Sequence, residues 1–112
     1  MAHAFCGDFE SDCLNQVFGE NDAYRDHFLF WAERAAAKTQ GRIGYVPAVL
    51  KHLWHGAPKN RRYRQRDNEL TEFRFNPTDD LIITDVGSWD WSKNGRRFVP
   101  WAEEYFEARQ ER

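Results

Sequence analysis

Hydrophobic positions in the first third of the chain recur at the spacing of an α-helix. Residues 8–18 carry one such stripe, which consists of Phe9, Cys13, Leu14 and Val17. We expect Asp8 to cap this helix, Gly19 to end it, and Cys13 to be a small core residue. Residues 22–39 carry the strongest helical pattern, with a stripe of Tyr24, Phe28, Trp31 and Ala35.

Residues 42–54 lose the helical period. Ile43, Tyr45, Val46 and Val49 are β-branched or aromatic, which favours extended structure. Pro47 has no amide donor, so it suits an edge strand or the bend between two short strands. The segment therefore predicts one or two strands.

The second half of the chain mixes helical and extended patterns. The predicted elements are a basic helix over 59–74, a turn over 76–80, a strand over 81–84, a turn over 85–88, a strand over 89–91 and a helix over about 100–110. Neither a repeat nor a flexible linker interrupts the chain. We expect one domain over residues 1–112, of the α+β class, with three or four helices packed on a small, short-stranded sheet.

The composition makes aromatic rings the main core-forming side chains. The 112 residues include 9 Phe, 5 Trp and 4 Tyr, against 15 Leu, Ile, Val and Met together. Aromatic side chains are also enriched at protein interfaces, so some of these rings are available for a partner. No apolar run approaches the roughly 20 residues of a membrane helix, and no signal peptide follows Met1. These features predict a cytoplasmic protein without a membrane span.

One segment carries an unusual charge. Between Lys51 and Arg66 the chain has six Lys or Arg, two His and no acidic residue, in a protein of net charge −2. This basic segment, residues 51–66, has two interpretations. It is an anion site for phosphate or diphosphate, because Arg offers a planar fork to phosphate oxygens, or it is a solvated helix face. The net negative charge makes nucleic acid an unfavourable ligand.

His52 and His55 lie inside the basic segment and are candidate ligands for a divalent metal. Two residues three apart share a face on a helix but point to opposite sides of a strand. The spacing therefore does not establish that both imidazoles bind one metal.

Acidic residues and cysteines gather near the N-terminus. Asp8, Glu10 and Asp12 either supply a general base or a metal ligand, or only favour the dipole of a helix start. Cys6 and Cys13 are seven residues apart, which is not the paired spacing of a zinc ribbon. Two cysteines are also too few for a disulfide scaffold.

Three runs of the sequence stand out: GRIGYVP at 41–47, HLWHG at 52–56, and NRRY at 60–63 with Arg66. These runs resemble one region of GT-A-type, family-2-like glycosyltransferase-like proteins of bacteria and their phages. The similarity continues loosely through residues 75–77, 80–81, Asp85, Gly87, Trp91 and 105–109. It corresponds to the C-terminal, acceptor half of such enzymes, so we expect the nucleotide-binding half to be absent.

The resemblance implies a catalytic base and a metal site. Asp8 falls at the position of the base, and His52 or His55 falls at the position that completes the site for Mn or Mg. The metal would neutralise the diphosphate of a nucleotide-sugar.

The resemblance also implies a substrate site in the basic segment. The residues assigned to it are Asn60, Arg61, Tyr63, Arg66 and Trp54, of which the two arginines would face the diphosphate. The implied function is a glycosyltransferase-like module that binds a nucleotide-sugar diphosphate or a partner subunit, with little activity alone. A missing half would leave apolar surface exposed, which predicts self-association, such as a homodimer.

A protein-binding inhibitor without catalysis is the rival interpretation. A small, aromatic-rich chain with two oppositely charged faces suits a phage product that blocks a host protein, for example a defence component. This interpretation predicts a stoichiometric protein complex and no small-molecule ligand.

Overall fold

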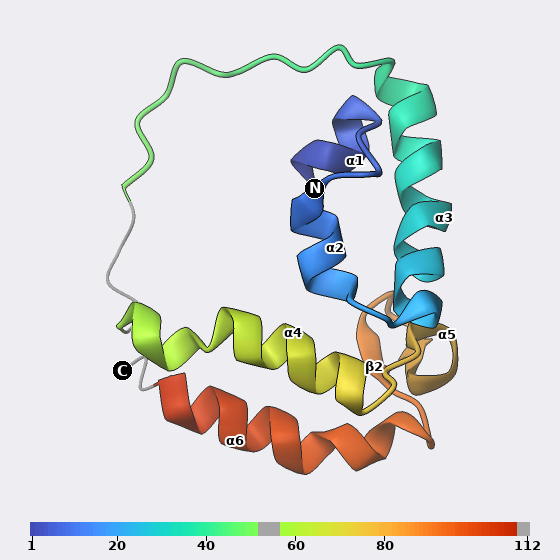
Figure 1. The fold of residues 1–112 in the computed structure, drawn as a ribbon, viewed down its shortest axis with the longest axis vertical. Helices are drawn as coiled ribbons and strands as arrows, with labels where there is room; N and C mark the ends of the chain where they lie inside the picture. The colour runs from blue at the N-terminus through green and yellow to red at the C-terminus, as the bar shows by residue number, and fades with distance from the viewer. Residues whose placement is uncertain (52–56, 110–112) are drawn as a thin grey trace.

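The computed structural model describes residues 1–51 and 57–109, which form six α-helices, two 3₁₀-helices and two strands (Figure 1). In chain order these are α1 (Ala2–Cys6), α2 (Asp12–Phe18), α3 (Asp22–Thr39), η1 (Pro58–Arg61), α4 (Tyr63–Glu72), α5 (Pro77–Asp80), β1 (Leu81–Ile83), β2 (Trp89–Trp91), η2 (Gly95–Phe98) and α6 (Val99–Arg109). Helices α1 and α2 lie beside α3, while α4 and α6 run in opposite directions in a second group. Helix α5 and the strands lie at the corner between the two groups.

The N-terminal helices pack through small residues and rings. Ala4 of α1 and Ala32 of α3 are fully buried, which lets the two backbones approach closely. The Phe5 ring meets the Trp31 ring edge-on at 5.9 Å between centroids. The Thr39 hydroxyl donates to the Phe5 carbonyl oxygen at 2.7 Å. Helix α1 was not predicted, because five residues are too few to show a period.

The helix predicted over 8–18 begins four residues later than expected. Its N-cap is Ser11, whose hydroxyl accepts from the Cys13 amide, so the prediction that Asp8 caps it is wrong. Leu14 and Phe18 are the buried residues of this helix, and Cys13 is exposed. The expectation of a buried Cys13 is therefore also wrong, because the shorter helix turns another face inward.

The predicted helix over 22–39 is confirmed as α3, and its N-cap ties the two halves of the chain together. The Asn21 Oδ1 accepts from the Tyr24 amide at 3.1 Å. Its Nδ2 donates to the Phe75 carbonyl oxygen at 2.9 Å. Phe28 and Tyr24 then pack their rings against the buried Phe18 of α2.

Residues 42–51 form no strand, although strands were predicted there. We call these ten residues the arm. Among the described residues the only strand pairing is β1 with β2, so the arm has no neighbouring strand to complete a ladder. The rest of the predicted stretch, 52–54, lies outside the described residues.

The C-terminal half follows the prediction closely. The basic helix over 59–74 is divided into η1 and α4 at Arg62, whose φ of 45° lies in the left-handed region. Strands β1 and β2 pair antiparallel, with Leu81 opposite Trp91 and Ile83 opposite Trp89. The predicted strands and the C-terminal helix are confirmed to within a residue.

A buried carboxylate organises the corner between the groups. Asp80 is 1% exposed and accepts from both Nη atoms of Arg97, the Nη2–Oδ2 distance being 2.9 Å. Its Oδ2 also accepts from the Asn76 amide at 2.8 Å. The Asp80 carbonyl oxygen accepts from the Ser92 amide at 2.9 Å. These bonds fix η2 and therefore place Phe98 in the core.

Phe98 is the centre of an aromatic core. The ring is 1% exposed and stacks on Trp91, with 5.6 Å between centroids and 20° between planes. Phe75 meets it edge-on at 5.4 Å, and Phe73 and Trp101 complete the surroundings. The expectation of a core built from rings is confirmed around this residue.

The predicted α+β class with a small sheet is confirmed, but the described residues hold six α-helices rather than three or four. The additional short helices depend on neighbours and caps. Helix α5 stands where a turn was predicted, because Asn76 caps the Thr78 amide and Pro77 occupies the first turn.

Gly95 provides a test of the packing at the corner. A Cβ at this position would lie 1.9 Å from the Asp80 carbonyl oxygen, which is backbone and cannot move aside. We expect Gly95→Ala to lower the free energy of unfolding by at least ~2 kcal/mol. Urea denaturation followed by circular dichroism measures this.

Gly44→Ala is the matched control, because a Cβ added to Gly44 would meet no atom within 4 Å. Its expected effect is within ~0.5 kcal/mol. Equal stability of the Gly95→Ala variant and the wild type would contradict the close approach.

Candidate functional site

The candidate site is the arm together with the basic segment that follows it. The arm leaves α3 at two successive residues in the left-handed region, Gln40 with φ 50° and Gly41 with φ 69°. The Arg42 amide still donates to the Thr39 carbonyl oxygen at 2.9 Å, and the Ile43 amide to that of Gly41 at 3.1 Å. From there the chain runs free of the helices (Figure 1).

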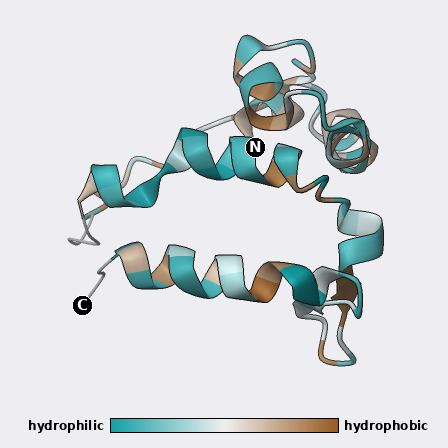
Figure 2. Cartoon of the chain, turned by 60° about the horizontal axis from the view of Figure 1, so that its bottom comes forward, coloured by the Kyte–Doolittle hydropathy of each residue, from teal (hydrophilic) through white to brown (hydrophobic). Residues whose placement is uncertain are grey.

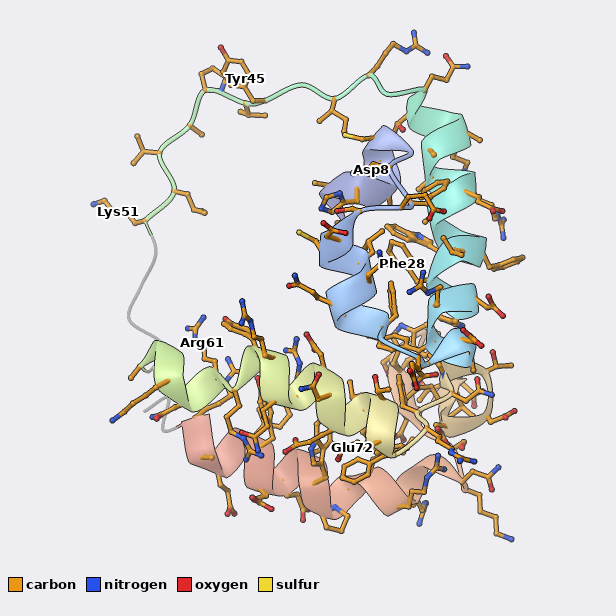
Figure 3. All side chains as sticks on the ribbon, viewed as in Figure 1. Asp8, Phe28, Tyr45, Lys51, Arg61 and Glu72 are labelled. Atoms are coloured by element: carbon orange, nitrogen blue, oxygen red, sulfur yellow. The ribbon has the colours of Figure 1, made fainter. Side chains whose placement is uncertain are left out.

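Apolar side chains of the arm face solvent. Tyr45, Val46, Val49 and Leu50 are between 83% and 91% exposed. Figure 3 shows Tyr45 and Lys51 projecting from the arm, away from both helical groups. Within the part of the chain that the structure describes, the backbone groups of residues 44–51 make no hydrogen bond. The arm thus presents apolar side chains and unpaired amides and carbonyls together.

The described part of the basic segment brings three of the predicted substrate residues together. Arg61 Nη1 donates to the Tyr63 hydroxyl at 2.7 Å. The guanidinium groups of Arg61 and Arg66 lie 5.9 Å and 5.5 Å from the centre of the Tyr63 ring. Both cations therefore share one aromatic ring.

Arg66 is also paired within its own helix. Its Nε and Nη2 donate to Asp67 Oδ1 at 3.0 Å and 2.8 Å. Partial burial lowers the pKa of Arg66, but the bond and the charge of Asp67 outweigh it, so the pKa is raised above the ordinary value. The charge of Arg66 is consequently permanent and partly neutralised.

Arg62 joins α4 to α6 through Glu69. Arg62 Nη2 donates to Glu69 Oε1 at 2.7 Å, and the Trp101 indole donates to Glu69 Oε2 at 2.7 Å. Burial raises the pKa of Glu69, but the bonds from Trp101 and Gln65 and the charge of Arg62 outweigh it, so the pKa lies below the ordinary 4.5. Part of the basic segment is thus a structural connection.

The remaining predicted site residues are dispersed or lie outside the described residues. Asn60 is half-buried in η1, where its amide donates to the Ala57 carbonyl oxygen at 2.9 Å. Asp8 is 2.8 Å from His3 Nδ1, and Figure 3 shows it well apart from Arg61. His52, Trp54 and His55 lie outside the described residues, so the implied Mn or Mg site is not described either.

The acidic residues and cysteines near the N-terminus do not form a metal-binding cluster in the described ranges. Asp8 lies outside any helix and Asp12 begins α2, so the two are not neighbours one helical turn apart. Cys6 and Cys13 are both free and exposed. Across residues 1–51 and 57–109, no group of three His, Cys, Asp or Glu side chains is arranged to hold a metal ion.

Sequence reasoning missed the pairing of Asp80 with Arg97 and the cleft beside it. The cleft has a volume of about 1000 Å³, is open to solvent, and is lined by Glu20, Asp22, Arg74, Asp79 and Arg97 among others. Seventeen residues separate Asp80 from Arg97, and no local spacing signals such a pair. The arm did carry a signal against a half-buried strand. Its apolar residues form a nearly continuous run and do not alternate with polar residues, as they would in such a strand.

Comparison with known proteins found no matching family model, curated protein or solved structure. None of the helices in the described ranges is both long and apolar enough to cross a lipid bilayer. The function is therefore inferred from the geometry of the chain itself.

The lowered pKa of Glu69 predicts a pH-dependent contribution to stability. A carboxyl whose folded pKa is depressed stabilises the fold above its unfolded pKa, and this stabilisation is lost as the pH falls through the folded pKa. We expect Glu69→Gln to lower the free energy of unfolding by ~1 kcal/mol at pH 6.5. The difference from wild type should shrink as the pH falls below 4.5.

Urea denaturation at pH 6.5 and at successive lower pH values measures the difference. Glu104→Gln is the control, because Glu104 is 76% exposed and lies 3.6 Å from Arg62. Its expected effect is below ~0.5 kcal/mol. If the difference in unfolding free energy between Glu69→Gln and the wild type does not change with pH, the lowered pKa of Glu69 is contradicted.

Proposed function

We propose that this chain is a protein-binding module and that the arm is its recognition segment. The observation that carries the proposal is the exposure of the four large apolar side chains at 45, 46, 49 and 50. Isolated exposed apolar residues are ordinary, but a contiguous group marks an interaction site. An inhibitor that binds another protein, which is the rival interpretation of the sequence, also needs an exposed interaction site. Docking to a partner subunit needs one as well.

The backbone of the arm supports the same proposal. An extended segment with unpaired amides and carbonyls is the form in which peptides add to the edge of a partner's sheet. Full burial of each large apolar side chain contributes ~1.5–3 kcal/mol, from which the cost of ordering the arm must be subtracted. Tyr45 is the best anchor, because tyrosines are enriched among the residues that dominate binding energy.

Charge defines the chemistry of the partner. Residues 42–66 contain no acidic side chain, and Lys51, Lys59 and Arg64 are exposed. These exposed cations accelerate association with an acidic surface and disfavour a basic one. The partner surface is therefore an apolar groove or sheet edge with acidic residues beside it.

Photo-crosslinking tests the proposal. A photoreactive residue at Val49 should give a discrete crosslinked species of defined mass in the cells that contain the protein. The double substitution Tyr45→Ser with Leu50→Ser should reduce its yield at least ~10-fold, since both anchors are lost.

Phe30 is the matched control, because it is exposed on α3 and lies outside the arm. Phe30→Ser should leave the crosslink from Val49 unchanged. If the double substitution has no effect, or if a photoreactive residue at Phe30 gives the same species, the arm is not the recognition segment.

A second candidate function is binding of a nucleotide-sugar diphosphate, as the glycosyltransferase resemblance implies. The observation that favours it is the proximity of Arg61, Tyr63 and Arg66. A diphosphate would have to compete with Asp67 for Arg66, because the two side chains already make a charge-assisted bond.

Thermal shift against nucleotide diphosphates and nucleotide-sugars, with and without Mn²⁺, tests this candidate. A ligand present at 100 times its Kd stabilises the fold by ~2.7 kcal/mol, which gives a clear rise in Tm. Arg61→Ala should abolish the rise, whereas Arg64→Ala, on the exposed face of α4, should retain most of it. A flat response of the folded wild type would exclude this candidate for the chain alone.

A further inference from the structure

The hairpin formed by β1 and β2 is another feature of the described residues that exposes apolar side chains, although the Trp89 ring contacts His27 edge-on. Ile83 is 64% and Trp89 is 59% exposed, and Ile82 and Val86 also face solvent. Figure 2 shows brown, hydrophobic positions in the hairpin, at the end of the molecule where α6 begins. The sheet has two strands within the described residues, so both of its outer edges are open. A two-stranded sheet of this kind gains most from an added strand.

The arm and the hairpin carry opposite charges. The arm contains Arg42 and Lys51 and no acidic residue. Residues 81–91 contain Asp85 and Asp90, both exposed, and no Lys or Arg. Each feature therefore combines exposed apolar side chains with the charge that complements the other.

The two features do not meet within one chain. The arm is held at one end by α3 and runs toward η1, while the hairpin lies at the opposite corner, beside α5 (Figure 1). A second copy of the chain supplies both features in the required combination. A two-fold axis would then make two equivalent contacts per dimer, each arm lying on the other chain's hairpin.

We infer that this chain forms a homodimer in which the arm of each copy adds as a strand to the open edge of the β1–β2 hairpin of the other. Every residue from 48 to 51 has an N–H group, and every second one can donate to the new ladder, whereas Pro47, which has no N–H, ends it. Val49 and Leu50 point to opposite faces of the added strand, so one of them packs on the face that carries the cross-strand pair Ile83 and Trp89. Lys51 and Arg42 face the acidic side of the hairpin. This inference rests on the proposed function and names its partner.

Charge reversal on each side provides the test. The arm variant carries Arg42→Glu and Lys51→Glu, and the hairpin variant carries Asp85→Lys and Asp90→Lys. In either variant alone, the arm and the hairpin have the same sign of charge, so the dimer Kd should rise at least ~10-fold. In an equimolar mixture, a mixed dimer has two contacts. At one contact the reversed arm meets the reversed hairpin, and at the other the native arm meets the native hairpin. Both contacts then join opposite charges, so dimerisation should return.

Sedimentation equilibrium at physiological ionic strength measures each dimer Kd. The control variant carries Asp26→Lys and Lys38→Glu, two exposed changes on α3 that should leave the Kd unchanged. A wild type that stays monomeric at high concentration would overturn the inference. So would a hairpin variant that dimerises as tightly as the wild type, or an equimolar mixture of the two variants that does not dimerise.

The crosslinking experiment separates this outcome from failure of the proposed function. If the chain is monomeric but still crosslinks through Val49 to a different protein, the proposed function holds and the homodimer is excluded. A crosslinked species of twice the chain mass that disappears in the hairpin variant supports both the proposed function and the homodimer. A monomeric chain with no arm-dependent crosslink would overturn both.

Discussion

The C-terminal half of this fold depends on one buried carboxylate. Asp80 receives both Nη atoms of Arg97, the amide of Asn76 on its side chain and the amide of Ser92 on its carbonyl oxygen. A carboxylate that is 1% exposed is tolerated only when it is fully paired. The need to satisfy it brings α5, the hairpin and η2 to one point. Gly95 lies against the Asp80 carbonyl group because no side chain fits there. Phe98 follows three residues later and enters the ring core as a result.

Aromatic residues have two roles in this molecule. Phe18, Phe75 and Phe98 are buried and belong to one network of ring contacts, in which Tyr24 links Phe18 to Phe75. Tyr45, Trp89 and Phe106 remain exposed. With few aliphatic side chains, a chain of this length builds its core from a minority of large rings, and the rest are available for contacts with another protein. Tyr45 lies on the arm and Trp89 on the hairpin, and the two proposals about binding use these rings together with the exposed aliphatic side chains beside them.

The basic segment illustrates how a charge count differs from a charged surface. Its cations are numerous in the sequence, but Arg62 is paired with Glu69 and Arg66 with Asp67. These acids lie immediately after the segment, on the next turns of α4. The remaining exposed cations are Lys51 on the arm, Lys59 in η1 and Arg64 in α4. Exposed cations suit electrostatic selection of a protein surface, and the cluster around Tyr63 keeps diphosphate binding as a separate, testable candidate.

The sequence by itself determined the elements whose signal is local. The spacing of apolar residues predicted α3, the two strands with their turn at Gly87, and α6. Each of these elements is specified by residues that are close to one another in the sequence. Arg61, Tyr63 and Arg66 are also close in the sequence, but their contact depends on the break at Arg62, which no local pattern predicted. Only the tertiary structure decided the start of α2 at Ser11, the pairing of Asp80 with Arg97 and the state of the arm. β-Branched residues favour a strand, but a strand forms only where a second strand accepts its hydrogen bonds, and within the described residues this chain offers none to the arm.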